Sequence, residues 1–333
     1  MADSLPGLAE ENMVLDRYLS PRPEGQPAAL VCGTMNFGKR TPAAESEQII
    51  ARALEHGIAF FDTANAYNGG ESERIVGKAL RGKKARIATK CGIGPDLKKA
   101  EGLAKATVQR ACEESLGRLG VERIDLYYLH KPDPATPLSE TVEALIRLRE
   151  QGKIDRWAVS NFASWQVGDL QQLCDARGFE RPAASQVIYN LLIRQLDLEY
   201  FRFARAHGVH TTVYNPLAGG LLAGKGLPGQ KLEKGSRFES NPMYRSRYLS
   251  QRFFELVEAY AALAASAGFT LVDLSYAWIA SRPGVDSVLL GPATVEQLDA
   301  AVRACARHLP EGLAAKIDDL YRAFVGTDLS YAR

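Results

Sequence analysis

The sequence predicts an α/β fold, a closed (β/α)8 (TIM) barrel with an extra C-terminal helix and a long loop after the seventh strand. Eight short runs rich in β-branched residues recur along the chain, and stretches with helical spacing of apolar residues lie between them. Several of these stretches end at a glycine just before the next strand. No Pro-, Gly- or Ser-rich linker divides the chain, so we expect residues 1–333 to form one barrel domain.

The sequence predicts eight strands. Several of them are apolar throughout, which is typical of parallel strands covered on both faces. In chain order, the expected strands are Ala29–Cys32, Ile58–Thr63, Ala85–Lys90, Ile124–His130, Ile154–Ser160, Ser185–Tyr189, His210–Tyr214 and Val285–Leu290.

The helices follow the same order. In Glu45–His56 apolar residues recur at helical spacing, and Gly57 follows as a C-terminal stop. The same pattern predicts Ala104–Leu119, Leu138–Gln151, Trp165–Arg177, Leu198–His207, Leu271–Ser281 and Val295–Ala306, with Glu311–Val325 outside the repeat.

The longest interruption is Leu217–Ser250, a stretch rich in Gly and Arg between the seventh and eighth strands. Loops that follow barrel strands surround the catalytic end of the barrel. We therefore expect this segment to be a lid or a ligand clamp.

Composition excludes several classes of protein. The 41 basic and 39 acidic residues give a net charge of +2, which indicates neither nucleic acid nor an anionic membrane as the partner. No apolar run approaches the ~20 residues of a membrane helix, and the first residues lack a signal-peptide pattern. The five scattered cysteines contain no Cys-x-x-Cys pair. We expect a cytoplasmic protein without a metal site, monomeric or homodimeric, that acts on a small molecule.

Ionisable side chains stand at the ends of three consecutive strands. Asp62 and Tyr67 follow the second strand, Lys90 ends the third and His130 ends the fourth. Functional residues of a parallel barrel gather at the carboxyl ends of its strands, so we expect these four on one rim. Taken singly, each also has a structural interpretation, as a turn former, half-buried packing, a solvated strand end or a core histidine.

These four residue types together suit proton delivery to a carbonyl oxygen. A tyrosine with its usual pKa of about 10 is a weak acid at neutral pH. A nearby ammonium favours the phenolate and eases proton release, and a carboxylate can hold that ammonium in place. The imidazole can orient or polarise the oxygen that receives the proton.

The run DTANAYNGGESERIVG, residues 62–77, resembles the signature of the aldo-keto reductase family. Further marks of the family occur in order over about residues 15–305: Gly33–Gly38, Thr89-Lys90, Leu129-His130, Val159–Asn161, Gln186 with Tyr189-Asn190, Tyr214–Leu217 and Gly291–Leu298. The resemblance implies a barrel that binds NADPH, or alternatively NADH, without a Rossmann domain. It also implies hydride transfer from the cofactor to an aldehyde or ketone.

Roles follow from the resemblance position by position. It implies that Tyr67 is the general acid, that Lys90 lowers its pKa, that Asp62 partners Lys90 and that His130 orients the substrate. It further implies a cofactor site formed by Gly33, Thr34, Met35, Asp62, Ser160, Asn161, Gln186, Tyr214, Asn215, Pro216, Leu217, Gly219, Gly220, Leu221, Lys225, Arg237, Gly291, Thr294 and Gln297. Within this set, the small residues near Gly219 would let backbone N–H groups approach the pyrophosphate.

The chain departs from the family pattern in places. Ala158 replaces a usual Gly, Asn215 a commoner Ser, and Ala301 an Asn at the adenine end. No Lys or Arg lies in residues 291–301 to meet a 2′-phosphate, so the preference for NADPH depends on Arg237 or Lys225.

A narrower resemblance concerns the basic segment after the seventh strand. The runs Ser236–Phe238 and Tyr244–Tyr248 and the ending Ser330–Arg333 resemble the aflatoxin-aldehyde and succinic-semialdehyde reductase branch. Arginines there suit a substrate carboxylate, because a guanidinium can form two parallel hydrogen bonds with it. They also suit cofactor phosphates or exposure to water.

Two other functions remain open. Barrels of this family also serve as cofactor-binding accessory subunits, although the short segment before the first strand of this chain favours an enzyme. Alternatively, Lys90 forms a Schiff base with a carbonyl substrate, as in aldolase-type barrels; Asp62 would disfavour this by keeping Lys90 protonated.

Overall fold

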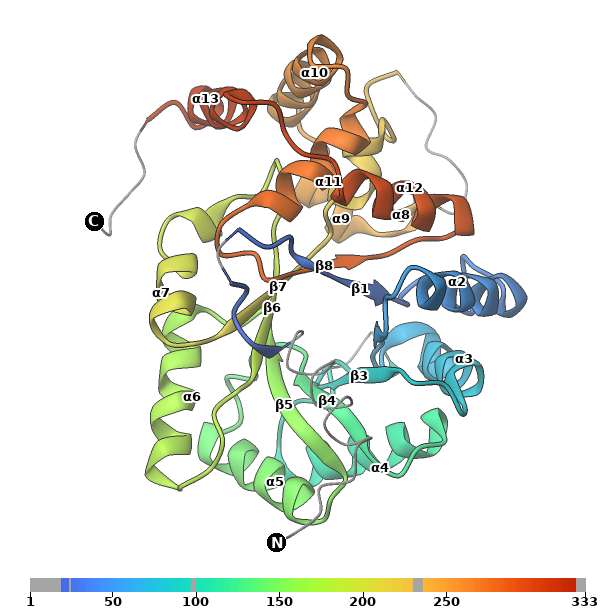
Figure 1. The fold of residues 1–333 in the computed structure, drawn as a ribbon. Helices are drawn as coiled ribbons and strands as arrows, with labels where there is room; N and C mark the ends of the chain where they lie inside the picture. The colour runs from blue at the N-terminus through green and yellow to red at the C-terminus, as the bar shows by residue number, and fades with distance from the viewer. Residues whose placement is uncertain (1–18, 24, 97–99, 230–235, 328–333) are drawn as a thin grey trace, which may run out of the picture.

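A computed structural model describes residues 19–23, 25–96, 100–229 and 236–327. Its eight parallel strands form a closed barrel in sequential order, which confirms the predicted fold class (Figure 1). The strands are β1 (Ala29–Gly33), β2 (Phe60–Asp62), β3 (Arg86–Cys91), β4 (Ile124–Leu129), β5 (Ile154–Ser160), β6 (Ala184–Ile188), β7 (His210–Tyr214) and β8 (Ser287–Leu290).

Helices surround the barrel and follow the strands in turn (Figure 1). They are α2 (Ala43–Glu55), α3 (Glu71–Leu80), α4 (Lys105–Leu119), α5 (Leu138–Glu150), α6 (Ser164–Ala176), α7 (Tyr200–Ala206), α11 (Leu271–Ser281) and α12 (Val295–Cys305), with α13 (Leu313–Val325) outside the repeat. The sequence pattern does not predict α3, because its first turn is polar and Gly77 interrupts its apolar residues.

The segment after β7 contains more helix than the sequence predicts. Residues 217–250 include the 3-10 helix η3 (Ala218–Ala223) and the short helices α8 (Arg237–Ser240) and α9 (Pro242–Tyr248). A further helix, α10 (Gln251–Ser266), comes next. Local capping explains these starts, since Asn241 precedes a proline at the first position of α9 and Ser250 accepts a bond from the backbone of α10.

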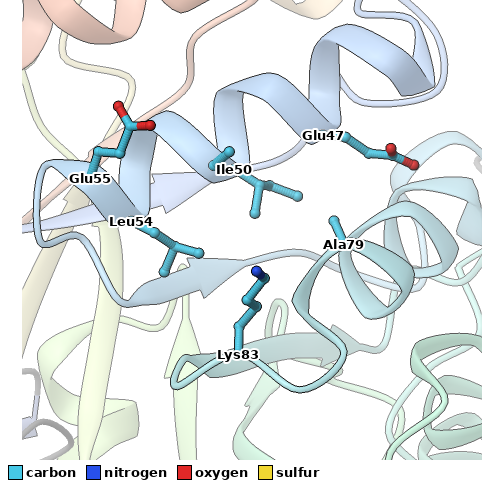
Figure 2. Close-up of a pocket in the computed structure, with 7 residues that line it drawn as sticks. Glu47, Ile50, Leu54, Glu55, Ala79 and Lys83 are labelled. Carbon is cyan, nitrogen blue, oxygen red and sulfur yellow. The ribbon is translucent and has the colours of Figure 1, made fainter.

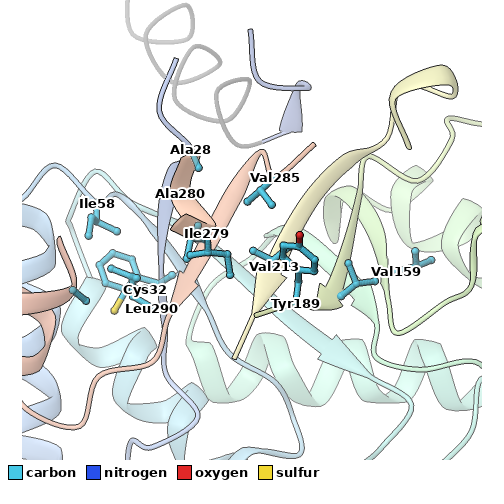
Figure 3. Packing of buried hydrophobic residues seen from close by; sticks show 14 of the residues in the cluster. Ala28, Cys32, Ile58, Val159, Tyr189, Val213, Ile279, Ala280, Val285 and Leu290 are labelled. Carbon is cyan, nitrogen blue, oxygen red and sulfur yellow. The ribbon is translucent and has the colours of Figure 1, made fainter. Parts of the chain in front are cut away.

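The buried apolar residues form two layers. A small cluster fills the barrel interior with alternate strand residues such as Phe60, Ala88 and Tyr128. The larger cluster lies between the strands and the helices and includes Cys32, Val213 and other residues seen in Figure 3. Because side chains of a strand alternate between its faces, strands such as β2 and β4 contribute to both layers.

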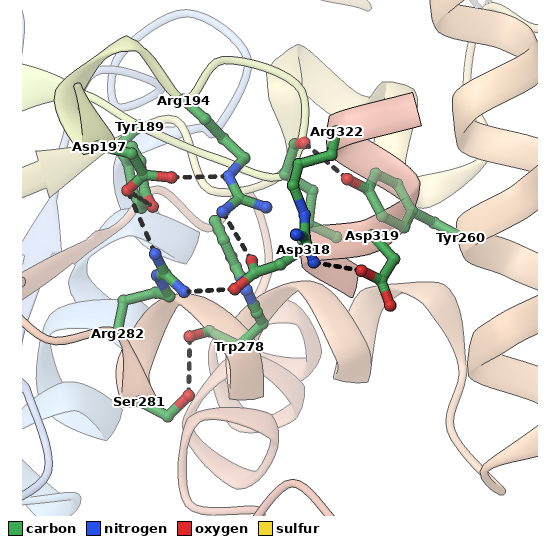
Figure 4. Close-up of polar contacts among 11 residues, drawn as sticks. Tyr189, Arg194, Asp197, Tyr260, Trp278, Ser281, Arg282, Asp318, Asp319 and Arg322 are labelled. Atoms are coloured by element: carbon green, nitrogen blue, oxygen red, sulfur yellow. Dashed lines mark hydrogen bonds and ion pairs between the residues drawn. The ribbon is translucent and has the colours of Figure 1, made fainter. Parts of the chain in front are cut away.

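Helix α13 is held by ion pairs as well as apolar contacts (Figure 4). The guanidinium of Arg194 donates to Asp197 (2.8 Å) and to Asp318 of α13 (2.7 Å), and it lies 4.6 Å from the ring centroid of Tyr321. Arg282, at the end of α11, contacts the same two carboxylates at 3.3 and 3.4 Å. These contacts attach α13 to the segment that follows β6.

Among the described residues, no single helix has the length and apolar character to cross a membrane. Helices α10 and α11 pass that test only as a pair, and they meet at an angle of 90°. The five cysteines are buried and unpaired.

Candidate active site

Strand alternation places the predicted side chains inside the carboxyl end of the barrel. Phe60 and Ala88 belong to the interior cluster, so Asp62 and Lys90, two residues further along, share the interior face. Lys90 pairs in register with Tyr128, which also points inward. The three neighbouring strands thus bring the ionisable groups to one end of the interior.

Lys90 and Asp62 form a buried ion pair at the centre of this site. Their side chains are 0% and 1% exposed, and Lys90 Nζ contacts Asp62 Oδ1. Lys90 Nζ also donates to the backbone oxygen of Thr63 (2.8 Å), while Gln186 Nε2 donates to the second oxygen of Asp62 (2.8 Å). Hydrogen bonds on every side compensate for the loss of water around the two charges.

Tyr67 approaches this pair from a tight turn, η1 (Tyr67–Gly70). The positive φ angles of Asn68, Gly69 and Gly70 return the chain towards the barrel. The Tyr67 ring centroid lies 5.2 Å from Lys90 Nζ and 5.9 Å from the His130 ring, which it meets edge to face. The turn is tied to the first strand's loop, because Asn68 Nδ2 donates to the backbone oxygen of Phe37 (2.6 Å).

Burial controls the protonation of the site. It raises the pKa of Tyr67 well above its ordinary value, and the charge of Asp62 raises it further. Burial lowers the pKa of Lys90, an effect that Asp62 opposes. Burial and then the charge of Lys90 lower the pKa of His130 well below its ordinary value, so this imidazole is neutral at pH 7. The family resemblance implies that Lys90 lowers the pKa of Tyr67; in the structure burial raises this pKa, and the charge that acts to lower it is that of Arg237.

Ser160, Asn161 and Tyr214 form a second polar group beside His130. Asn161 Nδ2 donates to the backbone oxygen of His130 (2.9 Å) and to Ser160 Oγ (3.0 Å). Tyr214 OH donates to Asn161 Oδ1 (2.7 Å). Asn161 has a φ of 63°, a left-handed conformation that asparagine adopts more readily than most residues.

The segment after β7 is tied back to its strand by Asn215. Asn215 Oδ1 accepts from the backbone N–H of Gly219 (2.7 Å), and Asn215 Nδ2 donates to the hydroxyl of Tyr248 on α9 (2.6 Å). Gly219 has a φ of 72°, and a Cβ atom there would lie 2.7 Å from the Tyr244 ring. Only glycine fits this position, because the left-handed φ and the contact with Tyr244 both exclude a side chain.

The same segment carries Arg237 across to the end of β8. Arg237 Nη1 donates to the hydroxyl of Tyr244 (2.8 Å), and its Nη2 atom is the nearest neighbour of the Cβ position of Gly291, at 3.8 Å. Lys225 lies against Gly220, where a Cβ atom would be 3.4 Å from its side chain. Of the remaining residues predicted here, Pro216 and Leu221 are buried and Leu217 is partly buried.

Residues predicted for the cofactor site near the first and last strands also form hydrogen bonds and close contacts that stabilise the local backbone. Thr34 is fully buried and donates to the backbone oxygen of Asp62 (2.9 Å), whereas Met35 is 41% exposed. The side chain of Thr294 caps α12 by accepting from the N–H of Gln297 (3.3 Å). The Cβ position of Gly33 is 3.1 Å from β8, so only a small residue fits there.

The arginines proposed as a carboxylate clamp have different surroundings. Arg245 donates to the backbone oxygens of Phe238 and Glu239, whereas Arg247 opposes the rise that burial causes in the pKa of Tyr214. Arg247 therefore faces the site, whereas Arg245 stabilises the end of α8. Arg333 lies outside the described residues.

A separate groove of about 430 Å³ lies between α2 and α3, outside the barrel (Figure 2). Its lining mixes apolar side chains, such as Ile50 and Leu54, with Glu47, Glu55 and Lys83. None of the residues predicted for the site lines this groove, and the ionisable cluster inside the barrel remains the candidate site.

Sequence reasoning missed three polar residues around this cluster. Glu73 and Ser72 are fully buried on the first turn of α3, and Tyr248 is fully buried on α9. The first two lie within the motif that contains Tyr67, and their polarity in the first turn of a short helix was the available signal.

The closed barrel defines a (β/α)8-barrel protein, and its ionisable cluster lies at the strand ends, where barrel enzymes have their active sites. The model of the Aldo/keto reductase family matches residues 29–322, and the chain belongs to this family. Members of the family are oxidoreductases that act on small-molecule carbonyls and in general use nicotinamide cofactors.

Several known proteins are similar to this chain. Human "Aflatoxin B1 aldehyde reductase member 2" is 36% identical over 84% of this chain and 82% of its own length, which confirms the resemblance to that branch. "Probable voltage-gated potassium channel subunit beta" of Arabidopsis thaliana is 31% identical over 81% of this chain and 84% of its own. A solved glycerol dehydrogenase from Gluconobacter oxydans superimposes with a TM-score of 0.74 and 26% identity, over 95% of this chain and 99% of that one.

Proposed function

We propose that the protein is a cytoplasmic NADPH-dependent reductase that converts an aldehyde or ketone to an alcohol, with the proton supplied by Tyr67. The observation that carries the proposal is the juxtaposition of Tyr67, the Lys90–Asp62 pair and His130 at one end of the barrel interior. NADH is the alternative cofactor, and a monomer or homodimer the assembly.

The residues around this cluster fit a nicotinamide cofactor. Lys225, beside Gly220, and Arg237, beside Gly291, supply positive charge for the cofactor phosphates. The polar group of Ser160, Asn161 and Tyr214 would hold the nicotinamide end, together with Gln186. When bound, the reduced cofactor supplies the hydride.

The chain's own residues account for the proton. Burial raises the pKa of Tyr67, so the phenol keeps its proton at neutral pH and is available as a general acid. An oxygen that becomes an alkoxide is a strong enough base to take that proton. Lys90 then stabilises the negative charge that develops on Tyr67, and the neutral His130 orients the oxygen.

Substitution of Tyr67 tests this assignment. Tyr67→Phe should lower kcat with a good aldehyde by about 10²–10⁴-fold, since general acid catalysis typically contributes that much. The affinity for NADPH, followed by quenching of protein fluorescence, should remain unchanged. Tyr127→Phe is the matched control, because this tyrosine on β4 points away from the interior and donates to the backbone of Val108. Comparable loss of kcat in both variants, or in neither, would refute the role of Tyr67.

Cofactor preference has its own test. We attribute recognition of the 2′-phosphate to Arg237, which lies beside Gly291. Arg237→Gln should raise KM for NADPH by about tenfold, as expected for one charged hydrogen bond, with little change for NADH. Arg177→Gln, just after the end of α6, is the control, and an equal effect on both cofactors would contradict the assignment.

A binding role without turnover is the second candidate, because one relative of similar coverage is named a potassium channel subunit. Such a protein would bind NADPH but reduce none of a panel of aldehydes, 1,2-dicarbonyls and ketones. The Schiff-base alternative is disfavoured by the contact of Lys90 with Asp62. Borohydride trapping of a carbonyl substrate on Lys90 would instead support it.

A further inference from the structure

We propose that Glu73 is a positioning residue for Tyr67 and Lys90: its buried carboxylate joins the helix that follows the turn of Tyr67 to Thr89 on β3, and its negative charge acts on Lys90. The inference rests on the proposed function, since it assigns Glu73 to the proton-delivery step. Glu73 itself does not touch the reacting atoms.

Glu73 links three elements of the barrel. It is fully buried on the first turn of α3, three residues after Gly70, where the turn that begins with Tyr67 ends. Its Oε1 atom accepts from the hydroxyl of Thr89 (2.6 Å), the residue before Lys90 on β3. Its Oε2 atom accepts from Arg118 Nε on α4 (2.5 Å), whose side chain is 13% exposed.

Arg118 brings this link back to the turn that carries Tyr67. Gly70, the last residue of η1, has a φ of 83°. A Cβ atom at Gly70 would lie 2.5 Å from Arg118 Cδ and 2.7 Å from Arg118 Nε. One guanidinium therefore packs against the end of the turn and pairs with the carboxylate that contacts β3.

Anchoring α3 does not by itself require a charge at this position. Ser72 already fixes the first turn, since its hydroxyl bonds with those of Thr34 (2.8 Å) and Thr63 (2.9 Å). Burying an ion pair is often no more stabilising than burying apolar side chains of similar size. A fully buried carboxylate bonded to Thr89, the residue before Lys90, is thus better explained by its charge than by its contribution to stability.

The charge of Glu73 acts on Lys90. Burial lowers the pKa of Lys90, whereas Asp62 and, more weakly, Glu73 raise it, so Glu73 helps to keep this lysine protonated. The charged and titratable groups around Lys90 and Tyr67 are Asp62 of β2, Tyr128 of β4, His130 after β4, and Tyr214, Tyr244 and Arg237, which act on Tyr67. Those around Glu73 are Cys112 and Arg118 of α4, and Glu114 lies beyond Arg118.

Two substitutions test the inference, because they should move the alkaline limb of the kcat–pH profile in opposite directions. In Glu73→Gln, loss of the negative charge lowers the pKa of Lys90, so the alkaline limb of the kcat–pH profile should move to lower pH. In Arg118→Gln, the negative charge of Glu73 is no longer compensated by Arg118, so the pKa of Lys90 rises and the limb should move to higher pH. We expect kcat of Glu73→Gln to fall about 3- to 10-fold at neutral pH, less than the ~10²-fold that a 1 Å misplacement can cause. The Kd for NADPH should not change.

Controls separate charge from structure. Thr89→Val removes one hydrogen bond but keeps the carboxylate, so it should lower kcat without moving the limb. Glu114→Gln removes the outer carboxylate near Arg118, whose Oε2 atom is 3.8 Å away, and should leave kcat unchanged. If Glu73→Gln does not fold, Arg118→Gln and Thr89→Val decide the question.

The outcomes distinguish the role of Glu73 from the proposed reductase function. An unmoved limb in Glu73→Gln and Arg118→Gln, with Tyr67-dependent turnover intact in the wild type, overturns the role of Glu73 alone. A limb that moves to lower pH in Arg118→Gln also overturns it. Absence of Tyr67-dependent turnover in the wild type overturns the proposed function and the role of Glu73 with it.

Discussion

Gly77→Ala should destabilise the protein because α3 and α4 touch at the backbone there. A Cβ atom at Gly77 would lie 1.9 Å from the backbone oxygen of Leu119 and 2.5 Å from its carbonyl carbon. Neither atom belongs to a flexible side chain, so the helices themselves must separate. Ordinary contact begins at 3.4 Å, which requires a displacement of about 1.5 Å.

The size of the effect follows from this displacement. Overpacking typically costs about 1–3 kcal/mol, and a clash with backbone belongs at the upper end. Replacing glycine by alanine inside a helix recovers about 0.5–1 kcal/mol. The net loss is therefore about 2 kcal/mol, which corresponds to a fall in Tm of roughly 3 °C, since the entropy of unfolding is about 2 cal/mol/K for each of the 333 residues.

The assay is thermal and urea unfolding followed by circular dichroism. Gly117→Ala on α4 is the matched control, because no atom lies within 4 Å of its Cβ position. It should stabilise the protein by up to about 1 kcal/mol. Equal stability of Gly77→Ala and the wild type, or an equal loss in Gly117→Ala, would refute the reasoning. Because α3 also carries Glu73, Gly77→Ala should lower kcat as well.

Two further predictions concern stability. Hydrogen bonds from Arg52 and then His56 lower the pKa of Asp299 to about 2, so its stabilising contribution is present above the ordinary aspartate pKa and is lost as the pH falls towards 2. Asp299→Asn should therefore flatten the fall in stability between about pH 4 and pH 2, measured by urea unfolding at each pH. Arg194→Met should cost about 3 kcal/mol, because it leaves Asp318 with only the longer contact to Arg282. Limited proteolysis should then cut α13 faster than in the wild type, and unchanged cleavage would contradict the anchoring role.

Much of the fold follows from local patterns. Strand β7 and helix α11 have the predicted bounds, and β2 and β8 begin two residues later than predicted. Helix α3 was not predicted, because it contains Gly77. This glycine is required by the close contact with Leu119, which belongs to another helix. The short helices after β7 depend on capping residues that the sequence pattern does not weigh.

The placement of Asp62, Lys90 and His130 at neighbouring strand ends could also be predicted from the sequence, because a parallel barrel repeats the same geometry at each strand. The interactions of these side chains could not be predicted. Gln186 reaches Asp62 across 124 positions of the chain, and Glu73 meets Arg118 across 45. Nothing in a single segment encodes such a distance.

The sequence by itself therefore determined the order of elements, the alternation of strand faces and the identity of the residues at the strand ends. The tertiary structure decided which side chains meet and how deeply each is buried. This division has a physical cause. Periodicity is a property of one segment, whereas hydrogen bonds between strands and the loss of hydration that raises the pKa of Tyr67 arise only when the barrel closes.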